Sequence, residues 1–152
     1  HDVACVLHTH TPAGMAVSAL ECGLLPINQT AMRFAGSVGY HDFEGVTVHE
    51  GEQRRLGQYP GTRPVLILRN HGLLVAEHHV PTAYYWMYPL QRACEVQVMA
   101  DSMAGATRPL TREARGVSAR DMTQTDPQGA LFQKVFEAAV RRAKVTLDAL
   151  VA

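Results

Sequence analysis

Two histidines separated by a single residue end an apolar stretch in "VACVLHTHTPAG". Residues 2–10 have the β-branched and apolar composition of a strand, in which side chains alternate between two faces. His8 and His10 would therefore point to one face, with Cα atoms about 7 Å apart, and could converge on one cation. His71, beside Gly72 in "RNHG", could add a third imidazole from a turn. Three imidazoles leave coordination positions for water or substrate, which is typical of a catalytic metal site.

A simpler interpretation needs no ion. In that interpretation His8 and His10 are hydrogen-bonded residues at the end of a strand, and His71 is an ordinary turn residue. The spacing of the three histidines does not by itself decide between the two, because a motif match is only a hypothesis until its structural setting is known.

The segments next to the histidines carry clear boundary signals. A helix over residues 12–22 is predicted after Thr11, a good N-cap, with Pro12 at its first position and Gly23 just past its end. Residues 64–68 and 73–76 are predicted to form two strands of a hairpin. The turn between these strands is expected to use Gly72 at positive φ.

The rest of the chain alternates helical and extended patterns. A long helix over 82–104 is expected to be capped by Thr82, to end at Gly105, and to be kinked or split at Pro89. The remaining predictions are a short strand at 25–29, a helical turn near 30–35, a loop over 35–45, a short polar helix at 50–58, and an irregular segment followed by a C-terminal amphipathic helix within 106–152. This order predicts a layered α/β domain.

Composition narrows the class of protein. The chain has 152 residues, 47% of them apolar and 18% charged, with zero formal net charge. These values predict a single domain over residues 1–152 and give no electrostatic reason to expect nucleic acid or an anionic membrane as a partner. The longest apolar run is far too short to span a membrane.

The cysteines bear on the cellular compartment, and the first residue bears on the N-terminal boundary of the domain. Three widely spaced cysteines, Cys5, Cys22 and Cys94, predict reduced thiols and a cytoplasmic location. The chain begins with His1, and its first residues already lead into a buried strand. We therefore expect that the N-terminal part of the domain is missing from this sequence.

Two motifs and their separation resemble the class II aldolase/adducin family. They are "VLHTHTPAGMAVSAL" and "LILRNHGLLVAE", and "QRACEVQVMA" at 91–100 is similar to the helix that follows them in the family. The resemblance covers residues 1–104. It implies that His8, His10 and His71 bind one divalent ion, zinc before others. It also implies an αβα arrangement with a central, largely antiparallel sheet between helical layers, and a homotetramer with its active sites near subunit interfaces.

The same resemblance implies a function. Family enzymes stabilise an enediolate or enolate of a small hydroxy-carbonyl or sugar-derived substrate, which makes a metal-dependent lyase that cleaves a C–C bond the first expectation. Decarboxylases, dehydratases and epimerases of the family are alternatives. So are a non-catalytic adducin-like interaction domain, a branch in which the triad is generally not intact, and a domain in which the ion is only structural.

The sequence also departs from the pattern of the family. The acid/base glutamate and the phosphate-binding loop of family aldolases would precede His1. The catalytic tyrosine of the sugar-phosphate aldolases has no match in "PINQTAMRF", and Tyr40 lies too far along to take that role. No catalytic acid or base is therefore assigned. His41, Asp42 and Glu44 lie in the predicted loop, which could approach the site.

Overall fold

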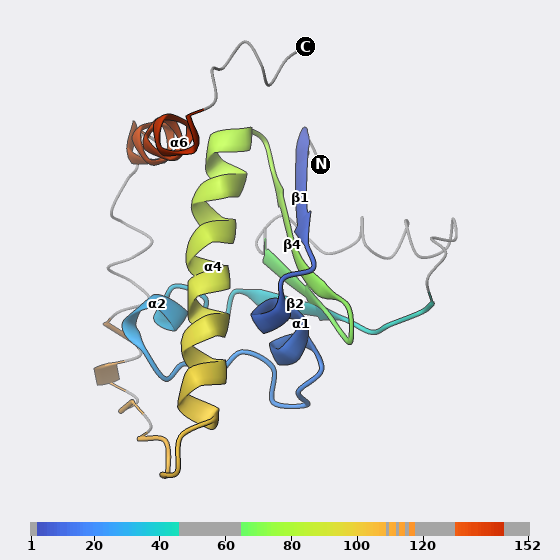
Figure 1. The fold of residues 1–152 in the computed structure, drawn as a ribbon, viewed down its shortest axis with the longest axis vertical. Helices are drawn as coiled ribbons and strands as arrows, with labels where there is room; N and C mark the ends of the chain where they lie inside the picture. The colour runs from blue at the N-terminus through green and yellow to red at the C-terminus, as the bar shows by residue number, and fades with distance from the viewer. Residues whose placement is uncertain are drawn as a thin grey trace.

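The computed structural model describes residues 3–45, 65–108, 110–111, 113–114, 116–117 and 130–144. Its strands and helices are arranged as Figure 1 shows. The strands are β1 (Cys5–Thr9), β2 (Val38–His41), β3 (Val65–Leu68) and β4 (Gly72–Glu77), and the helices are α1 (Pro12–Ser18), α2 (Gln29–Met32), α4 (Val80–Asp101) and α6 (Ala130–Ala143). The predicted polar helix at 50–58 lies outside the described residues.

The four strands form one mixed sheet in the order β1-β4-β3-β2. β4 pairs antiparallel with both β1 and β3, so the predicted hairpin is confirmed, but β2 pairs parallel with β3. The expectation of a largely antiparallel sheet was wrong at this edge, where residues 35–45 were expected to be only a loop. Gly36 and Gly39 lower the strand propensity of that segment, and its pairing with the fully buried β3 outweighs this.

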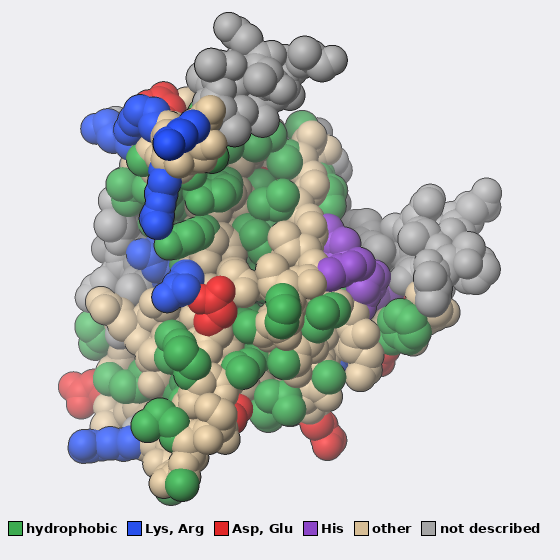
Figure 2. All heavy atoms as spheres, in the orientation of Figure 1, with side chains coloured by type: hydrophobic (Ala, Val, Ile, Leu, Met, Phe, Trp, Pro, Cys, Tyr) green, Lys and Arg blue, Asp and Glu red, His purple; other side chains and the backbone are tan. Residues whose placement is uncertain are grey.

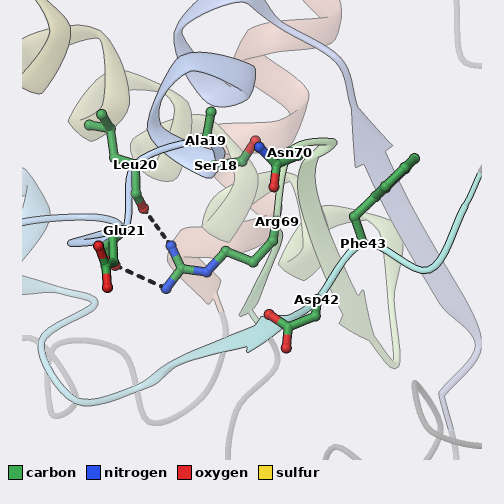
Figure 3. Close-up of a pocket in the computed structure, with 8 residues that line it drawn as sticks. All are labelled: Ser18, Ala19, Leu20, Glu21, Asp42, Phe43, Arg69 and Asn70. Atoms are coloured by element: carbon green, nitrogen blue, oxygen red, sulfur yellow. Dashed lines mark hydrogen bonds between the residues drawn. The ribbon is translucent and has the colours of Figure 1, made fainter.

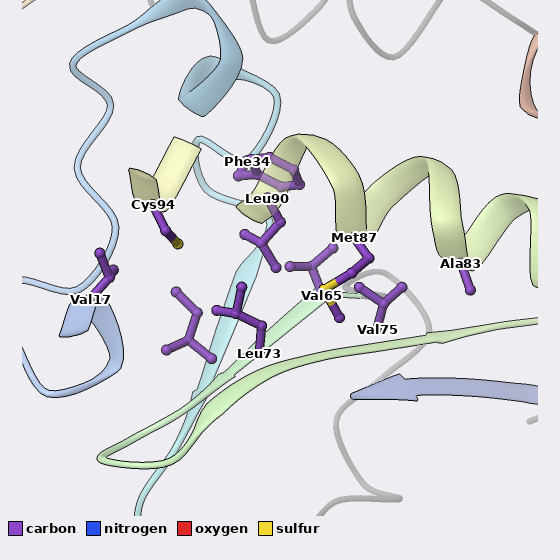
Figure 4. Packing of buried hydrophobic residues seen from close by; sticks show 10 residues of the cluster. Val17, Phe34, Val65, Leu73, Val75, Ala83, Met87, Leu90 and Cys94 are labelled. Carbon is purple, nitrogen blue, oxygen red and sulfur yellow. The ribbon is translucent and has the colours of Figure 1, made fainter. Parts of the chain in front are cut away.

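One face of the sheet carries the hydrophobic core. Leu73 and Val75 of β4 are completely buried there against Met87 and Leu90 of α4 (Figure 4). β3 is buried along its whole length, which explains its uninterrupted apolar sequence. α1 and α4 cover this face of the sheet, and α6 packs on α4. The opposite face of β1 carries His8 and His10.

α1 begins where the sequence predicts. The hydroxyl of Thr11 accepts a hydrogen bond from the Gly14 amide at 3.3 Å, and Pro12 follows at the first position. The helix ends at Ser18, earlier than the predicted residue 22, and Gly23 then adopts a φ of +61°. α1 is therefore a short, firmly capped helix directly after the paired histidines.

The turn of the hairpin differs from the prediction in one respect. Asn70, with a φ of 56°, takes the left-handed conformation that was expected of Gly72. Asparagine tolerates this conformation better than most residues. Gly72 is the first residue of β4, and a Cβ there would run into the Thr9 carbonyl of β1. Glycine is needed at this position for close packing rather than for its φ.

The long helix α4 is continuous from Val80 to Asp101 and passes through Pro89, so of the two expectations, a kink or a split, the split was wrong. It begins before Thr82, with no side-chain cap, and ends before Gly105. Near its C-terminus the buried Gln97 donates to the Gly23 carbonyl at 2.9 Å and accepts from the Leu25 amide at 2.7 Å. These bonds hold the segment after α1. The strand predicted at 25–29 is absent: residues 25–28 have no regular structure, and Gln29 begins α2.

α6 covers only part of the predicted C-terminal helix, because residues 126–129 and 145–152 lie outside the described residues. Phe132 packs against Tyr85 of α4 with ring centroids 4.3 Å apart, and Phe136 lies 5.9 Å from Tyr84. Among the described helices, none is both long and apolar enough to cross a membrane.

Candidate metal centre

The structure brings the three predicted histidines together. His8 and His10 project from one face of β1, and His71 comes from the turn that precedes β4. The Nε2 atom of His8 lies 2.6 Å from that of His10 and 3.4 Å from that of His71. One nitrogen from each ring lies within 4.8 Å of the others. Figure 2 shows histidine side chains gathered at the surface, and His8 and His10 are both exposed.

The pairing of β1 with β4 fixes how His8 is oriented. His8 is opposite Leu74, and its Nδ1 lies 2.8 Å from the carbonyl oxygen of Leu73. A carbonyl only accepts, so Nδ1 carries the proton and donates it in this bond. In the neutral ring this leaves the lone pair on Nε2, which faces His10 and His71. A hydrogen bond from the outer ring nitrogen to a carbonyl is the usual support for a metal-binding imidazole.

The donor set fits a divalent ion such as zinc. Two nitrogens on a tetrahedral zinc ion are about 3.3 Å apart when each Zn–N bond is about 2.0–2.1 Å. The separation of His8 from His71 matches that value. The His8–His10 separation is a hydrogen-bond distance, and this pair would have to open by about 0.7 Å to take the same geometry. Imidazole nitrogens are good ligands for zinc and other transition metals.

A pocket of about 590 Å³ lies next to the turn that carries His71. Figure 3 shows its walls, which come from the end of α1, the segment after β2 and the turn between β3 and β4. Charged groups from each wall, Glu21, Asp42 and Arg69, border it. Arg69 also stacks on Tyr40, with its guanidinium carbon 4.2 Å from the ring centroid. The pocket therefore offers both signs of charge to a small polar molecule.

The segment after β2 approaches the histidines through Phe43. The Phe43 ring lies edge-on to His71, with centroids 6.1 Å apart. His41, the last residue of β2, is buried, and its Nε2 is 3.6 Å from a carboxylate oxygen of Glu44. Within the described residues neither His41, Asp42 nor Glu44 belongs to the cluster of ligand atoms.

Several residues around the histidines could not be identified from the sequence. Ser18 contacts the backbone of His71, Arg69 contacts the end of α1, and Phe43 contacts the His71 ring. Each of these contacts joins segments far apart in the chain or depends on how β2 is placed. No local pattern in the sequence signals them.

Comparison with known proteins identifies the family. The sequence profile of the "Class II Aldolase and Adducin N-terminal domain" matches residues 1–98. A Pseudomonas aeruginosa protein named "Putative aldolase class 2 protein" is 50% identical over 102 residues, which are 67% of this chain and 39% of that protein. Alpha-adducin of Rattus norvegicus is 38% identical over 151 residues, covering 92% of this chain and 20% of the adducin.

Solved structures agree with the sequence comparison. The crystal structure of an aldolase II superfamily protein from Pseudomonas syringae has a TM-score of 0.85 and 36% identity, over 93% of this chain and 57% of that one. L-fuculose 1-phosphate aldolase from Glaciozyma antarctica PI12 shares the fold, with a TM-score of 0.68 at 24% identity over 95% of this chain and 56% of that one. The chain thus spans well under two thirds of the length of each of these proteins. It belongs to the class II aldolase and adducin family.

Proposed function

We propose that this chain forms part of a divalent-metal-dependent lyase of the class II aldolase type. Its substrate would be a small hydroxy-carbonyl or sugar-derived molecule, and the reaction would cleave a C–C bond. One observation carries the proposal: three imidazole nitrogens from His8, His10 and His71 converge at an exposed position next to a polar pocket. A bound ion, zinc before others, would supply Lewis-acid chemistry at the oxygens of the substrate.

The chain's own groups would hold and orient the reactants. His8, with its proton held on Nδ1 by the Leu73 carbonyl, would present the Nε2 lone pair to the ion without changing its tautomer. The pocket lined by Asp42 and Arg69 has room and polarity for a small hydroxylated molecule. A decarboxylase, dehydratase or epimerase would use the same metal site and differ in which bond is broken.

A second candidate is a non-catalytic, adducin-like interaction domain. The observation that favours it is the 38% identity to rat alpha-adducin, which extends over 92% of this chain. The two candidates differ in what they require of the histidines, because an interaction domain needs no ion at this position. Metal-dependent turnover therefore separates them.

The wider setting is proposed on the same basis. We propose a cytoplasmic homotetramer, in which residues 1–152 are one incomplete domain and a neighbouring subunit helps to complete each substrate pocket. The membership of the family supports the assembly, and the widely spaced, free cysteines support the location. Light scattering of the purified full chain would measure its oligomeric state.

The experiment that tests the function follows turnover in the purified full chain. A panel of hydroxy-acids, hydroxy-ketones and sugar phosphates is assayed before and after chelation, and again after zinc is restored. We expect chelation to abolish C–C cleavage and zinc to restore it. His10→Ala should remain inactive, whereas His78→Ala, which removes an exposed histidine outside the cluster, should behave like the unmodified chain.

Two results would count against the lyase. Turnover that survives complete removal of metal would refute the metal-dependent mechanism. A protein that binds no metal and turns over none of these substrates would favour the adducin-like candidate.

A further inference from the structure

The helix α1 connects the two segments that carry the histidines. It begins at Pro12, two residues after His10, and ends at Ser18, which contacts the turn containing His71. Seven helical residues span only about 10 Å. A single short, rigid element therefore joins ligand segments that are more than sixty residues apart in the sequence.

Ser18 connects the end of this helix to the turn that carries His71. Its side chain is completely buried, and its hydroxyl donates to the Met15 carbonyl at 2.8 Å. The same oxygen accepts from the backbone amide of His71 at 3.1 Å, an amide that also donates to the Leu68 carbonyl. The Ser18 carbonyl accepts from the Asn70 amide at 3.1 Å. Ser18 thus binds two successive amides of the turn through two different atoms.

Arg69 adds hydrogen bonds between the same turn and the residues that follow α1. Its guanidinium group donates to the carbonyl of Leu20 at 2.5 Å and to that of Glu21 at 3.2 Å, the two bonds drawn in Figure 3. The Leu20 carbonyl also accepts from the Gly23 amide at 2.9 Å. Asn70 and His71 therefore donate to the last residue of α1, and Arg69 donates to the segment that follows it.

We propose that Ser18 is a positioning residue for the metal centre. By binding the amides of Asn70 and His71, it sets the height and direction of the His71 imidazole relative to His8 and His10. This inference rests on the proposed function, because it requires that the three histidines bind an ion. A metal site tolerates displacements of only about 0.5 Å in its ligands, and loss of an outer contact commonly weakens binding about 10- to 100-fold.

The test compares Ser18→Ala with a chemically matched control. Ser102 at the end of α4 also donates its hydroxyl to the carbonyl three residues earlier, at 2.8 Å from Met99, but it does not contact the turn. Cobalt is the probe, because its visible absorption reports coordination geometry, and dissociation constants are measured by titrating the full chain. Thermal unfolding of the metal-free variants measures how much each substitution lowers the stability of the fold.

We expect Ser18→Ala to weaken cobalt binding about tenfold or more and to change the cobalt spectrum. Ser102→Ala should bind like the unmodified chain. If Ser18→Ala does not fold, Ser18→Cys serves instead, because it keeps nearly the size of the buried serine side chain while its sulfur accepts hydrogen bonds only weakly. The Ser18→Cys variant and the unmodified chain should then differ in cobalt spectrum.

The outcomes that overturn the inference can be told apart from failure of the proposed function. If the unmodified chain binds one cobalt ion, and the folded Ser18→Ala or Ser18→Cys variant binds it with the same affinity and spectrum, Ser18 has no positioning role although the metal site stands. If the unmodified chain binds no cobalt at all, both the metal site and the inference are wrong.

Discussion

Two pairs of histidines show how spacing decides whether exposed imidazoles converge. His8 and His10 are two residues apart on a strand, and their ring centroids are 4.5 Å apart. His78 and His79 are adjacent, exposed, and 6.5 Å apart. The imidazoles converge in the first pair because side chains at i and i+2 of a strand share a face. A count of histidines in the sequence would not have separated the two pairs.

Cys94 is a potentially reactive group that its buried environment makes unreactive. Burial raises the pKa of its thiol from 9.0 to about 12, and the neighbouring Glu95 carboxylate adds to the increase. A thiol that stays protonated is a poor nucleophile and a poor metal ligand. Cys94 therefore contributes to the core rather than to chemistry, in agreement with its position on the buried face of α4.

The raised pKa of Cys94 predicts how stability depends on pH. Above pH 9.0 the unfolded chain loses the thiol proton first, so the contribution of Cys94 to stability is complete below that pH and is lost as the pH rises towards about 12. Urea unfolding at about pH 7 and about pH 10 should show a larger loss of stability for the unmodified chain than for Cys94→Ala. Equal losses in the two proteins would show that the thiol does not titrate differently on folding.

At the scale of elements, α1 lies unusually close to the sheet. A Cβ at Gly14 would lie 2.7 Å from the Thr11 hydroxyl and 2.9 Å from Cγ of Leu73. The absence of a side chain at Gly14 therefore lets the capped start of α1 rest on β4. Since α1 also joins the two histidine segments, its distance from the sheet affects the metal centre.

The substitution Gly14→Ala sets two effects against each other. Alanine improves helix propensity by about 1 kcal/mol, while overpacking in a closely packed interior costs about 1–3 kcal/mol. Because the new contacts are with a cap residue and a fully buried leucine, we expect the clash to prevail and the free energy of unfolding to fall. Gly105→Ala, where a Cβ meets nothing within 4 Å, is the matched control. A stabilised Gly14→Ala variant would contradict the close packing of α1.

The elements differ in how well the sequence predicts them. Thr11 and Pro12 correctly locate the start of α1, because caps act within one turn of a helix. β2 was not recognised, because Gly39 within it and Gly36 just before it hide a strand that depends on pairing with β3. Local signals also suggested Gly72 for the left-handed turn position, yet Asn70 takes it, since β1 leaves no room for a Cβ at residue 72.

At the scale of the whole molecule, local sequence patterns predict part of the candidate site, and the packing of distant segments determines the rest. Strand periodicity and a turn suggested that His8, His10 and His71 could meet, and the structure brings them together; that they bind an ion remains a prediction. The contacts of Ser18, Arg69 and Phe43 arise only when distant segments pack. The relatives are considerably longer than this chain, so the acid, the base and the full substrate pocket are sought in the full-length protein and its assembly.

The most direct test of the metal centre is the metal content of the purified full chain, measured by elemental analysis after incubation with zinc and removal of the excess. The predicted result is one zinc ion per chain for the unmodified protein and for the control His78→Ala, with loss of nearly all bound zinc in His71→Ala. Zinc retained in a folded His71→Ala variant, or no zinc bound by the unmodified chain, would contradict a three-histidine metal centre.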